Sequence, residues 1–385
     1  MSAKKRNAPA ATGAIHDLER ATPERPESVS QSGSTGHASR GSPSAVQTIC
    51  LEGVVPTSVY WLWENWIAAG KLHLLAGAPG DGKTTIALQF AAVVSSGGVW
   101  PDGSRFNDGV GKNVLIWSGE DDVRDTIVPR LTAAGANLSN CHHVHGVDFG
   151  SGAQSFDPAR HVPELAKKFE ELGGVELLVL DPIVSAVRGD AHKNNEVRRG
   201  LQPLVDLAIA YRCALLGVTH LSKGTQGRTP LERVNGSIAF GALARIVLGT
   251  VKPSDPDVPG RLVRSKSNLG PDHEGFEYRL IQQEVSAGVK ASMVAWGERL
   301  EGSAFDLIND VECAAQDSSS NARIREWLLK RLADGPVISR TIKEETASLG
   351  FAWRTVQRAR LESRILAIRQ GFGEASTTVW SLPKA

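Results

Sequence analysis

The stretch Gly77-Ala78-Pro79-Gly80-Asp81-Gly82-Lys83-Thr84 decides the fold, because it fits the pattern G-x-x-x-x-G-K-[ST]. An apolar run, 72–76, precedes it, and Thr85 opens an apolar, helix-forming run behind it. In this pattern the glycines let backbone N–H groups turn toward a phosphate, the lysine neutralises the β and γ oxygens, and the hydroxyl holds Mg²⁺. A helix starting at the lysine adds its positive end. The stretch, with Thr85, therefore predicts a strand, a glycine loop and a helix that bind ATP.

Three further apolar runs have the length of buried strands, and each ends in a polar residue. They are 113–118, 175–181 and 213–219. Strands that alternate with helical segments around a phosphate loop predict an α/β fold with a mostly parallel sheet and helices on both faces. In such sheets the carboxyl ends of the strands meet at one edge and carry the chemistry. We therefore expect the polar residues at these ends to lie close to the glycine loop.

The polar residues at the strand ends have different predicted roles. Asp181 stands 98 residues after Lys83 (181 − 83), and we expect it to hold Mg²⁺ together with Thr84. Glu120 directly follows its strand, where a carboxylate can face the γ-phosphate and orient a water molecule. The next two carboxylates, Asp121 and Asp122, are expected to cap the following helix. His220 also ends a strand, although a single histidine there is more often a hydrogen-bonded structural residue, so its role stays open on residue type alone.

Composition divides the chain into four parts. Residues 1–45 are rich in Ala, Ser, Gly, Pro and charge, which predicts a disordered tail. Residues 46–309 carry the strands and helices of the phosphate-loop core. A short polar segment, 310–321, predicts a linker. Three amphipathic segments and a hairpin pattern in 322–385 predict a small winged helix-turn-helix domain.

Two basic segments are candidates for contact with DNA. The segment 222–237 contains three basic residues among Gly, Thr and Asn and predicts a mobile loop that contacts single strands. The last part of the chain, from residue 321 onward, has 12 Lys and Arg against 6 Asp and Glu. Helical spacing places four of its residues on one face, for contact with duplex DNA or simply as a solvated face. These four are Trp353, Arg354, Gln357 and Arg358.

The overall composition excludes several classes of protein. The formal charge is +1, from 43 Lys and Arg against 42 Asp and Glu, so any basic surface must be local. Four scattered cysteines without CxxC pairing argue against a disulfide framework or a zinc ribbon. No run of about 18 apolar residues exists, which predicts a cytoplasmic protein without membrane spans.

Once these motifs are set in order, the region from Val46 to Met293 resembles the RecA-like ATPases of the plasmid RepA helicase group, which are related to DnaB-type helicases. The resemblance implies a hexameric ring that uses ATP and Mg²⁺. It also implies that Glu120 activates water, Asp181 serves Mg²⁺, and His220 senses the γ-phosphate. The residues that carry it include Trp61-Leu-Trp63, Trp100-Pro-Asp-Gly103, Gly119-Glu-Asp-Asp122, Leu180-Asp-Pro182, Val218-Thr-His220 and Asn235-Gly-Ser-Ile-Ala-Phe240.

In ring-forming relatives, a basic side chain from the next subunit completes each site. DnaB-like proteins read K-x-R-N-G-P in this segment, whereas this chain reads Lys266-Ser-Asn268-Leu-Gly-Pro271. Asn268 replaces the finger arginine. By the resemblance, Lys266, or Arg264 on the same strand face, supplies the charge in trans.

The function expected from these residues is that of an ATP-hydrolysing, ring-forming DNA motor. Two alternatives remain open at this point. One is an ATP-gated regulator whose C-terminal domain reads duplex DNA, and the other is an accessory ATPase of recombination or repair.

Overall fold

The computed structural model describes residues 48–150, 152–191, 193–221, 238–253, 255, 258–370 and 377–383. The predicted disordered tail, 1–45, and the predicted basic loop, 222–237, lie outside these residues. By internal contacts the chain divides into residues 1–57 and 58–385. The described part of the first unit contains a 3-10 turn, Leu51–Gly53, whose residues are exposed. Among the described residues, no helix combines the length and the apolar character needed to cross a membrane.

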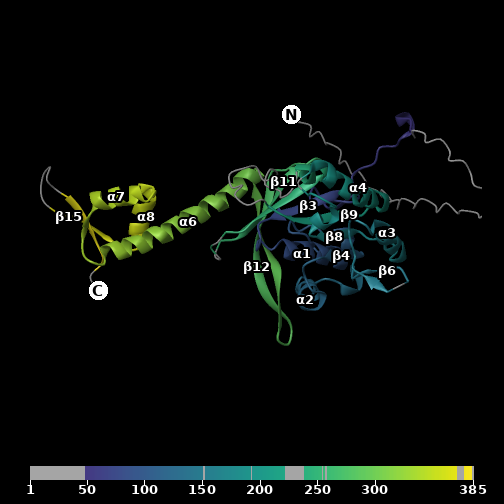
Figure 1. Ribbon diagram of the computed structural model, residues 1–385, viewed down its shortest axis with the longest axis horizontal. Coiled ribbons are helices and arrows are strands. Elements are labelled where there is room, and N and C mark those ends of the chain that lie inside the picture. Colours follow the sequence, from purple (N-terminus) through teal and green to yellow (C-terminus); the bar gives the residue numbers. More distant parts are fainter. Residues whose placement is uncertain are drawn as a thin grey trace, which may run out of the picture. The chain divides into compact units, whose positions relative to one another are not determined.

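A nine-stranded sheet forms the centre of the second unit, with the order β13-β12-β11-β10-β3-β9-β8-β4-β5 (Figure 1). The six strands from β10 to β5 run parallel, and β11, β12 and β13 continue the sheet antiparallel. This confirms the predicted α/β fold with a mostly parallel sheet. The strands are β3 (Leu72–Gly77), β4 (Val114–Ser118), β5 (Cys141–His143), β8 (Leu177–Asp181), β9 (Ala214–His220), β10 (Ile246–Val251), β11 (Gly260–Ser267), β12 (Glu274–Ser286) and β13 (Val289–Glu301).

Helices cover both faces of the sheet, because successive side chains of its buried strands point to opposite sides. In β3, Leu75 packs in one apolar cluster with α1 and α2, whereas Leu74 packs in another with α3, α4 and α5. The helices are α1 (Lys83–Ser96), α2 (Val128–Ala133), α3 (Val162–Glu171), α4 (Asn194–Tyr211) and α5 (Ile238–Leu243). Short 3-10 turns occur at Phe106–Gly109, Leu138–Asn140 and Ile183–Ala186, and a π-helical turn at Val123–Ile127 leads into α2.

The tryptophan-rich segment before the first sheet strand packs into the core. Its β1 (Trp61–Trp63) pairs with β2 (Ile67–Ala68). Trp63 stacks on Trp66 at 4.5 Å between ring centroids and on Trp100 at 5.1 Å. Both Trp63 and Trp66 are almost fully buried, so they close one side of the sheet as large apolar groups. A second short pair, β6 (Val147–Asp148) with β7 (Ala153–Gln154), lies between β5 and α3 in the chain.

The last part of the chain has its own apolar cluster, formed by three helices and a small antiparallel sheet of order β14-β16-β15. The elements follow in the order predicted for a winged helix-turn-helix, and that assignment stays a prediction. They are the end of α6 (Ala304–Leu332), β14 (Val337–Ile338), α7 (Ser339–Ser348), α8 (Trp353–Glu362), β15 (Leu366–Gln370) and β16 (Thr377–Ser381).

The segment predicted as a linker, 310–321, lies within the single long helix α6 (Figure 1). The start of this helix packs on β10 and β11 through Leu307 and Ile308, and its end joins the C-terminal cluster through Ile324 and Leu328. The polar composition of residues 310–321 indicated a linker without regular structure. However, α6 contains neither Gly nor Pro, so nothing interrupts its i to i−4 hydrogen bonds.

Candidate functional site: the phosphate-loop edge of the sheet

The register of the parallel strands brings the predicted site residues to one edge of the sheet. Gly77 at the end of β3 pairs with His220 at the end of β9, and Ser118 at the end of β4 pairs with Asp181 at the end of β8. Because β3, β9, β8 and β4 are successive neighbours, their carboxyl ends form one row. The expected meeting of these strand ends is therefore present in the structure.

The glycine loop has the backbone geometry that its sequence predicts. Gly80 and Gly82 have φ values of 87° and 84°, in the left-handed region that favours glycine. The helix α1 begins directly afterwards at Lys83, which is 6% exposed and donates a hydrogen bond from Nζ to the Ala78 carbonyl, 2.9 Å away. The lysine ammonium is therefore held against the backbone of its own loop.

A hydroxyl and a carboxylate meet beside this lysine. Thr84 Oγ1 donates to Asp181 Oδ2 at 2.6 Å, which joins the first turn of α1 to the end of β8. Burial raises the pKa of Asp181, and the Thr84 hydrogen bond opposes that rise. Hydroxyl and carboxylate oxygens are the ligands that Mg²⁺ prefers. The donor set at these two residues thus fits a magnesium ion, directly or through water.

The cation of Lys83 interacts electrostatically with the carboxylates around it. Burial lowers the pKa of Lys83, and the charges of Asp81, Asp181 and Glu120 act in the opposite direction. These carboxylates favour the charged form of the lysine, which is the form that pairs with phosphate oxygens.

Glu120 follows the end of β4 by two residues, and His220 is the last residue of β9. Glu120 is exposed, and its charge acts on the pKa values of Lys83, Asp181 and His220, which places its carboxylate near all three. Burial lowers the pKa of His220, with Lys83 adding to the shift. The Nδ1 atom of His220 is buried and has no hydrogen-bond partner among the described residues.

The two carboxylates after Glu120 have structural partners. Asp122 caps the following helical turn, since its side chain accepts hydrogen bonds from the N–H groups of Arg124 and Asp125. Asp121 was expected to act as a second cap. Instead, it forms an ion pair with Arg130 at 3.0 Å.

Arg264 does not have the placement that a trans-acting finger requires. Its side chain is fully buried, pairs with Glu274 at 3.0 Å, and lies over the ring of Trp66 at 4.6 Å. The expectation that it reaches a neighbouring subunit is therefore corrected. Lys266 and Arg264 were expected on one strand face, but a bulge in the pairing of β11 with β10 puts them on opposite faces, and the tryptophan segment encloses the guanidinium of Arg264.

Lys266 is also engaged within its own chain. Its Nζ donates to the carbonyls of Gly241 and Ala244, at 2.7 and 2.8 Å, at the end of α5. Burial lowers the pKa of Lys266, and Arg245 adds to the shift. Lys266 is half-buried, in contrast to the enclosed Arg264.

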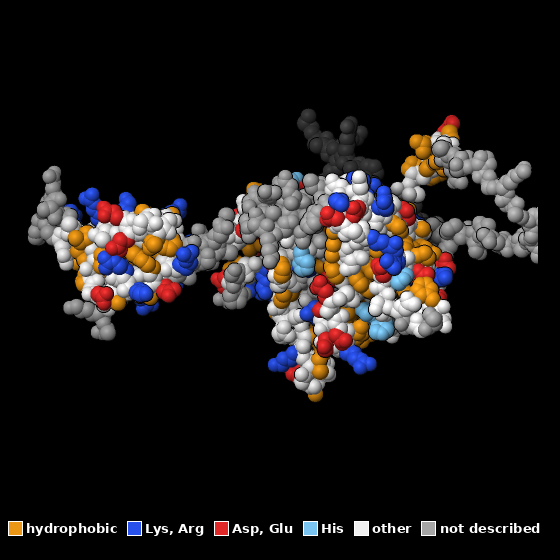
Figure 2. Space-filling model, in the orientation of Figure 1, with side chains coloured by type: hydrophobic (Ala, Val, Ile, Leu, Met, Phe, Trp, Pro, Cys, Tyr) orange, Lys and Arg blue, Asp and Glu red, His pale blue; other side chains and the backbone are white. Residues whose placement is uncertain are grey.

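The predicted nucleic-acid face of α8 is divided by the structure. Arg354 and Arg358 are exposed and Gln357 is half-buried, whereas Trp353 stacks on Trp380 at 5.4 Å and belongs to the C-terminal core. Trp353 is therefore a packing residue rather than part of an exposed face. In Figure 2, the visible surface around α7 and α8 intersperses Lys and Arg with Asp and Glu.

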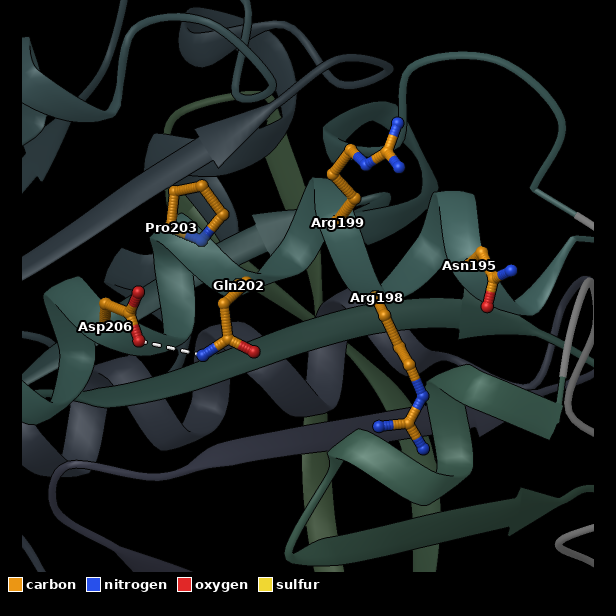
Figure 3. Close-up of a pocket in the computed structure, with 6 residues that line it drawn as sticks. All are labelled: Asn195, Arg198, Arg199, Gln202, Pro203 and Asp206. Atoms are coloured by element: carbon orange, nitrogen blue, oxygen red, sulfur yellow. Dashed lines mark hydrogen bonds between the residues drawn. The ribbon is translucent and has the colours of Figure 1, made fainter. Parts of the chain in front are cut away.

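A basic depression on α4 was missed in the sequence analysis. Arg198 and Arg199 line it and point in different directions from the helix (Figure 3). Gln202 donates to Asp206 at 2.8 Å along the same helix face. The adjacent arginines were the available signal in the sequence. Exposed guanidinium groups of this kind suit phosphate oxygens.

Comparison with known proteins agrees with the fold. Residues 38–226, a little under half of the chain, match a family model described as AAA domain. No curated protein matches. Among solved structures, the chain is similar to the RadB recombinase, with 19% identity, 58% of this chain and 91% of that chain covered, and a TM-score of 0.40. It is also similar to a solved structure described as an ATPase domain, with 15% identity, coverage of 55% and 81%, and a TM-score of 0.42.

Likenesses at these identities are too distant to assign an activity. The phosphate loop and the match to an AAA domain model over residues 38–226 support an ATPase.

Proposed function

We propose that the chain hydrolyses ATP at the phosphate-loop edge and acts on DNA as a ring-forming motor of the RepA helicase type. The observation that carries the proposal is the contact between Thr84 and Asp181 at 2.6 Å, beside the buried Lys83. A hydroxyl and a lysine from the first turn of α1 and a carboxylate from the end of β8 are the groups that hold a magnesium-bound triphosphate.

Each residue of the edge has one task in this proposal. The loop Gly77 to Thr85 binds the phosphates, and Lys83 holds the β and γ oxygens. Thr84 and Asp181 hold Mg²⁺, which supplies neutralisation of the phosphate charge when bound. Glu120 accepts a proton from the attacking water or orients it. His220 presents its unpartnered Nδ1 toward the γ-phosphate, where it distinguishes the triphosphate from the diphosphate.

The motor proposal also requires an oligomer and contact with DNA. We propose a hexamer in which Lys266 leaves the α5 carbonyls and serves the site of the next subunit. Loop 222–237 would contact single strands, and Arg354, Gln357 and Arg358 would contact duplex DNA. The exposure of both arginines supports this assignment and equally suits a second function, that of an ATP-gated regulator that reads duplex DNA.

A pair of assays tests the proposal and separates the two functions. Strand displacement and duplex binding are measured on the same protein with ATP and Mg²⁺. The motor proposal predicts ATP-dependent displacement with little preference among duplex sequences. Sharp duplex preference without displacement would favour the regulator, and absence of ATP hydrolysis would contradict both.

A further inference from the structure

Three contacts from outside the phosphate loop hold its middle in place. The Tyr278 hydroxyl in β12 donates to the Asp81 carbonyl at 2.6 Å. The Thr250 hydroxyl in β10 lies 3.4 Å from both Asp81 Oδ2 and the Ala76 carbonyl, and can donate its hydrogen to either. The Leu280 side chain covers Gly82, where an added Cβ would lie 2.7 Å from a Leu280 methyl.

Asp81 also ties the loop to itself. Its Oδ2 accepts the Ala78 N–H at 2.8 Å, so one carboxylate joins the first half of the loop to the second. The side chain is 7% exposed. Burial raises the pKa of Asp81 to about 6, while the Ala78 hydrogen bond and the charges of Lys83 and Lys252 oppose that rise. At neutral pH the group is mostly an ionised acceptor.

The packing at the start of the loop leaves no room for a side chain at Gly77. A Cβ added to Gly77 would lie 1.8 Å from Thr250 Oγ1 and 3.0 Å from Asp81 Oδ2. Thr250 and Tyr278 are each 1% exposed, so no solvent replaces their contacts. Two strands that carry none of the proposed catalytic groups therefore fix the path of the loop.

We propose that Thr250 and Tyr278 are positioning residues. Their hydroxyl groups hold Asp81 in place and so set the phosphate loop for nucleotide binding. This inference rests on the proposed function. The physical reason is that amide groups arranged around a phosphate stabilise it only when they are fixed in place beforehand, and small displacements are costly. Both residues act through Asp81 and do not touch the nucleotide.

Removal of either hydroxyl tests the proposal in the full-length chain. The variants are Thr250→Val and Tyr278→Phe, with Thr250→Ser as the conservative change that keeps a hydroxyl. We measure the Kd of a fluorescent ADP analogue with Mg²⁺, the KM and kcat for ATP, and the melting temperature without nucleotide. Loss of one buried hydrogen bond predicts a rise in Kd and KM of about 5- to 10-fold. We expect kcat within about twofold of wild type, and near-normal binding by Thr250→Ser.

Matched controls are available elsewhere in the chain. Thr346 is as buried as Thr250, and its hydroxyl bonds the Ile342 carbonyl in the C-terminal module at 2.7 Å. The Tyr211 hydroxyl donates to Glu170 at 2.7 Å on the surface of the core. Thr346→Val and Tyr211→Phe should leave nucleotide affinity unchanged, whatever they do to stability.

Two outcomes overturn the proposal in distinguishable ways. A lower melting temperature with unchanged Kd and KM in Thr250→Val and Tyr278→Phe would show that the contacts serve stability alone. In that case Lys83→Ala would still abolish binding, and the proposed function would stand. If wild-type protein and Lys83→Ala bind nucleotide equally poorly, the proposed function itself fails.

Discussion

The phosphate-loop edge and helix α8 hold their cations in opposite ways. At the edge, Lys83 is 6% exposed and fixed to a loop carbonyl. On α8, by contrast, Arg354 is exposed, and Arg358 is exposed although it pairs with Glu362. A fixed cation suits chemistry at one atom, because its position is determined before the substrate arrives. A solvated cation suits a long polyanion, which binds through many weak, salt-sensitive contacts.

The largest effect should come from the exposed carboxylate of the edge. We expect Glu120→Gln to keep nucleotide affinity and to lower kcat by roughly 10²-fold or more, because the amide cannot accept a proton from water. Steady-state hydrolysis and nucleotide titration on the same protein measure the two properties. Asp121→Asn is the matched control, since Asp121 pairs with Arg130 and should affect kcat little. The reverse pattern would place the catalytic carboxylate at Asp121.

Acid should lower the stability of the sheet core and leave that of the C-terminal module, residues 321–385, unchanged. His73 in β3 accepts the Ala68 N–H, and burial lowers its pKa to about 4, whereas residues 321–385 contain no histidine. His73 therefore binds a proton below about pH 6.5 in the unfolded state, but only below about pH 4 in the folded core. Stability of the core should fall by up to about 1.4 kcal/mol per pH unit as pH decreases through this window.

Urea unfolding at pH 7 and pH 5, followed separately for the core and the module, measures this difference. His73→Gln is the control, because its amide can accept the same N–H without titrating. A core with the same pH slope in wild type and His73→Gln would assign the acid sensitivity to other groups.

The smallest effects should come from single arginines of α8. Arg354→Ala should lower the slope of log affinity for duplex DNA against log salt by about one. Arg358→Ala should have less effect, because Arg358 is held by Glu362 at 3.1 Å. Glu362→Gln should then raise affinity by releasing Arg358. Fluorescence anisotropy at two salt concentrations measures all three variants, and unchanged binding in every one would make α8 a solvated face.

The sequence predicted the phosphate-loop edge well because its signals are local and the strands are buried. The glycine pattern, the apolar runs and the polar residues that end them fix both the parallel sheet and the row of strand ends. The register then brings Gly77 beside His220 and Ser118 beside Asp181, as the order of such a fold requires. Their chemical roles remain predictions.

Contacts between distant segments could not be predicted in the same way. The enclosure of Arg264 depends on Trp66, nearly 200 residues earlier in the chain, and the fixing of Asp81 depends on Tyr278, nearly 200 residues later. The strand β13 was also missed, because its polar and apolar residues do not form the run of a buried strand. Likewise, the polar composition of 310–321 concealed a continuous helix.

The most direct test of the account is Mg²⁺-dependent ATP hydrolysis by full-length wild type and Lys83→Ala, measured beside duplex binding on the same samples. We expect hydrolysis by wild type, none above background in Lys83→Ala, and equal DNA affinity for both in the absence of nucleotide. Removal of Lys83 takes away the counter-charge of the β and γ oxygens and leaves α8 untouched. Hydrolysis by Lys83→Ala at the wild-type rate would contradict the assignment of the phosphate-loop edge.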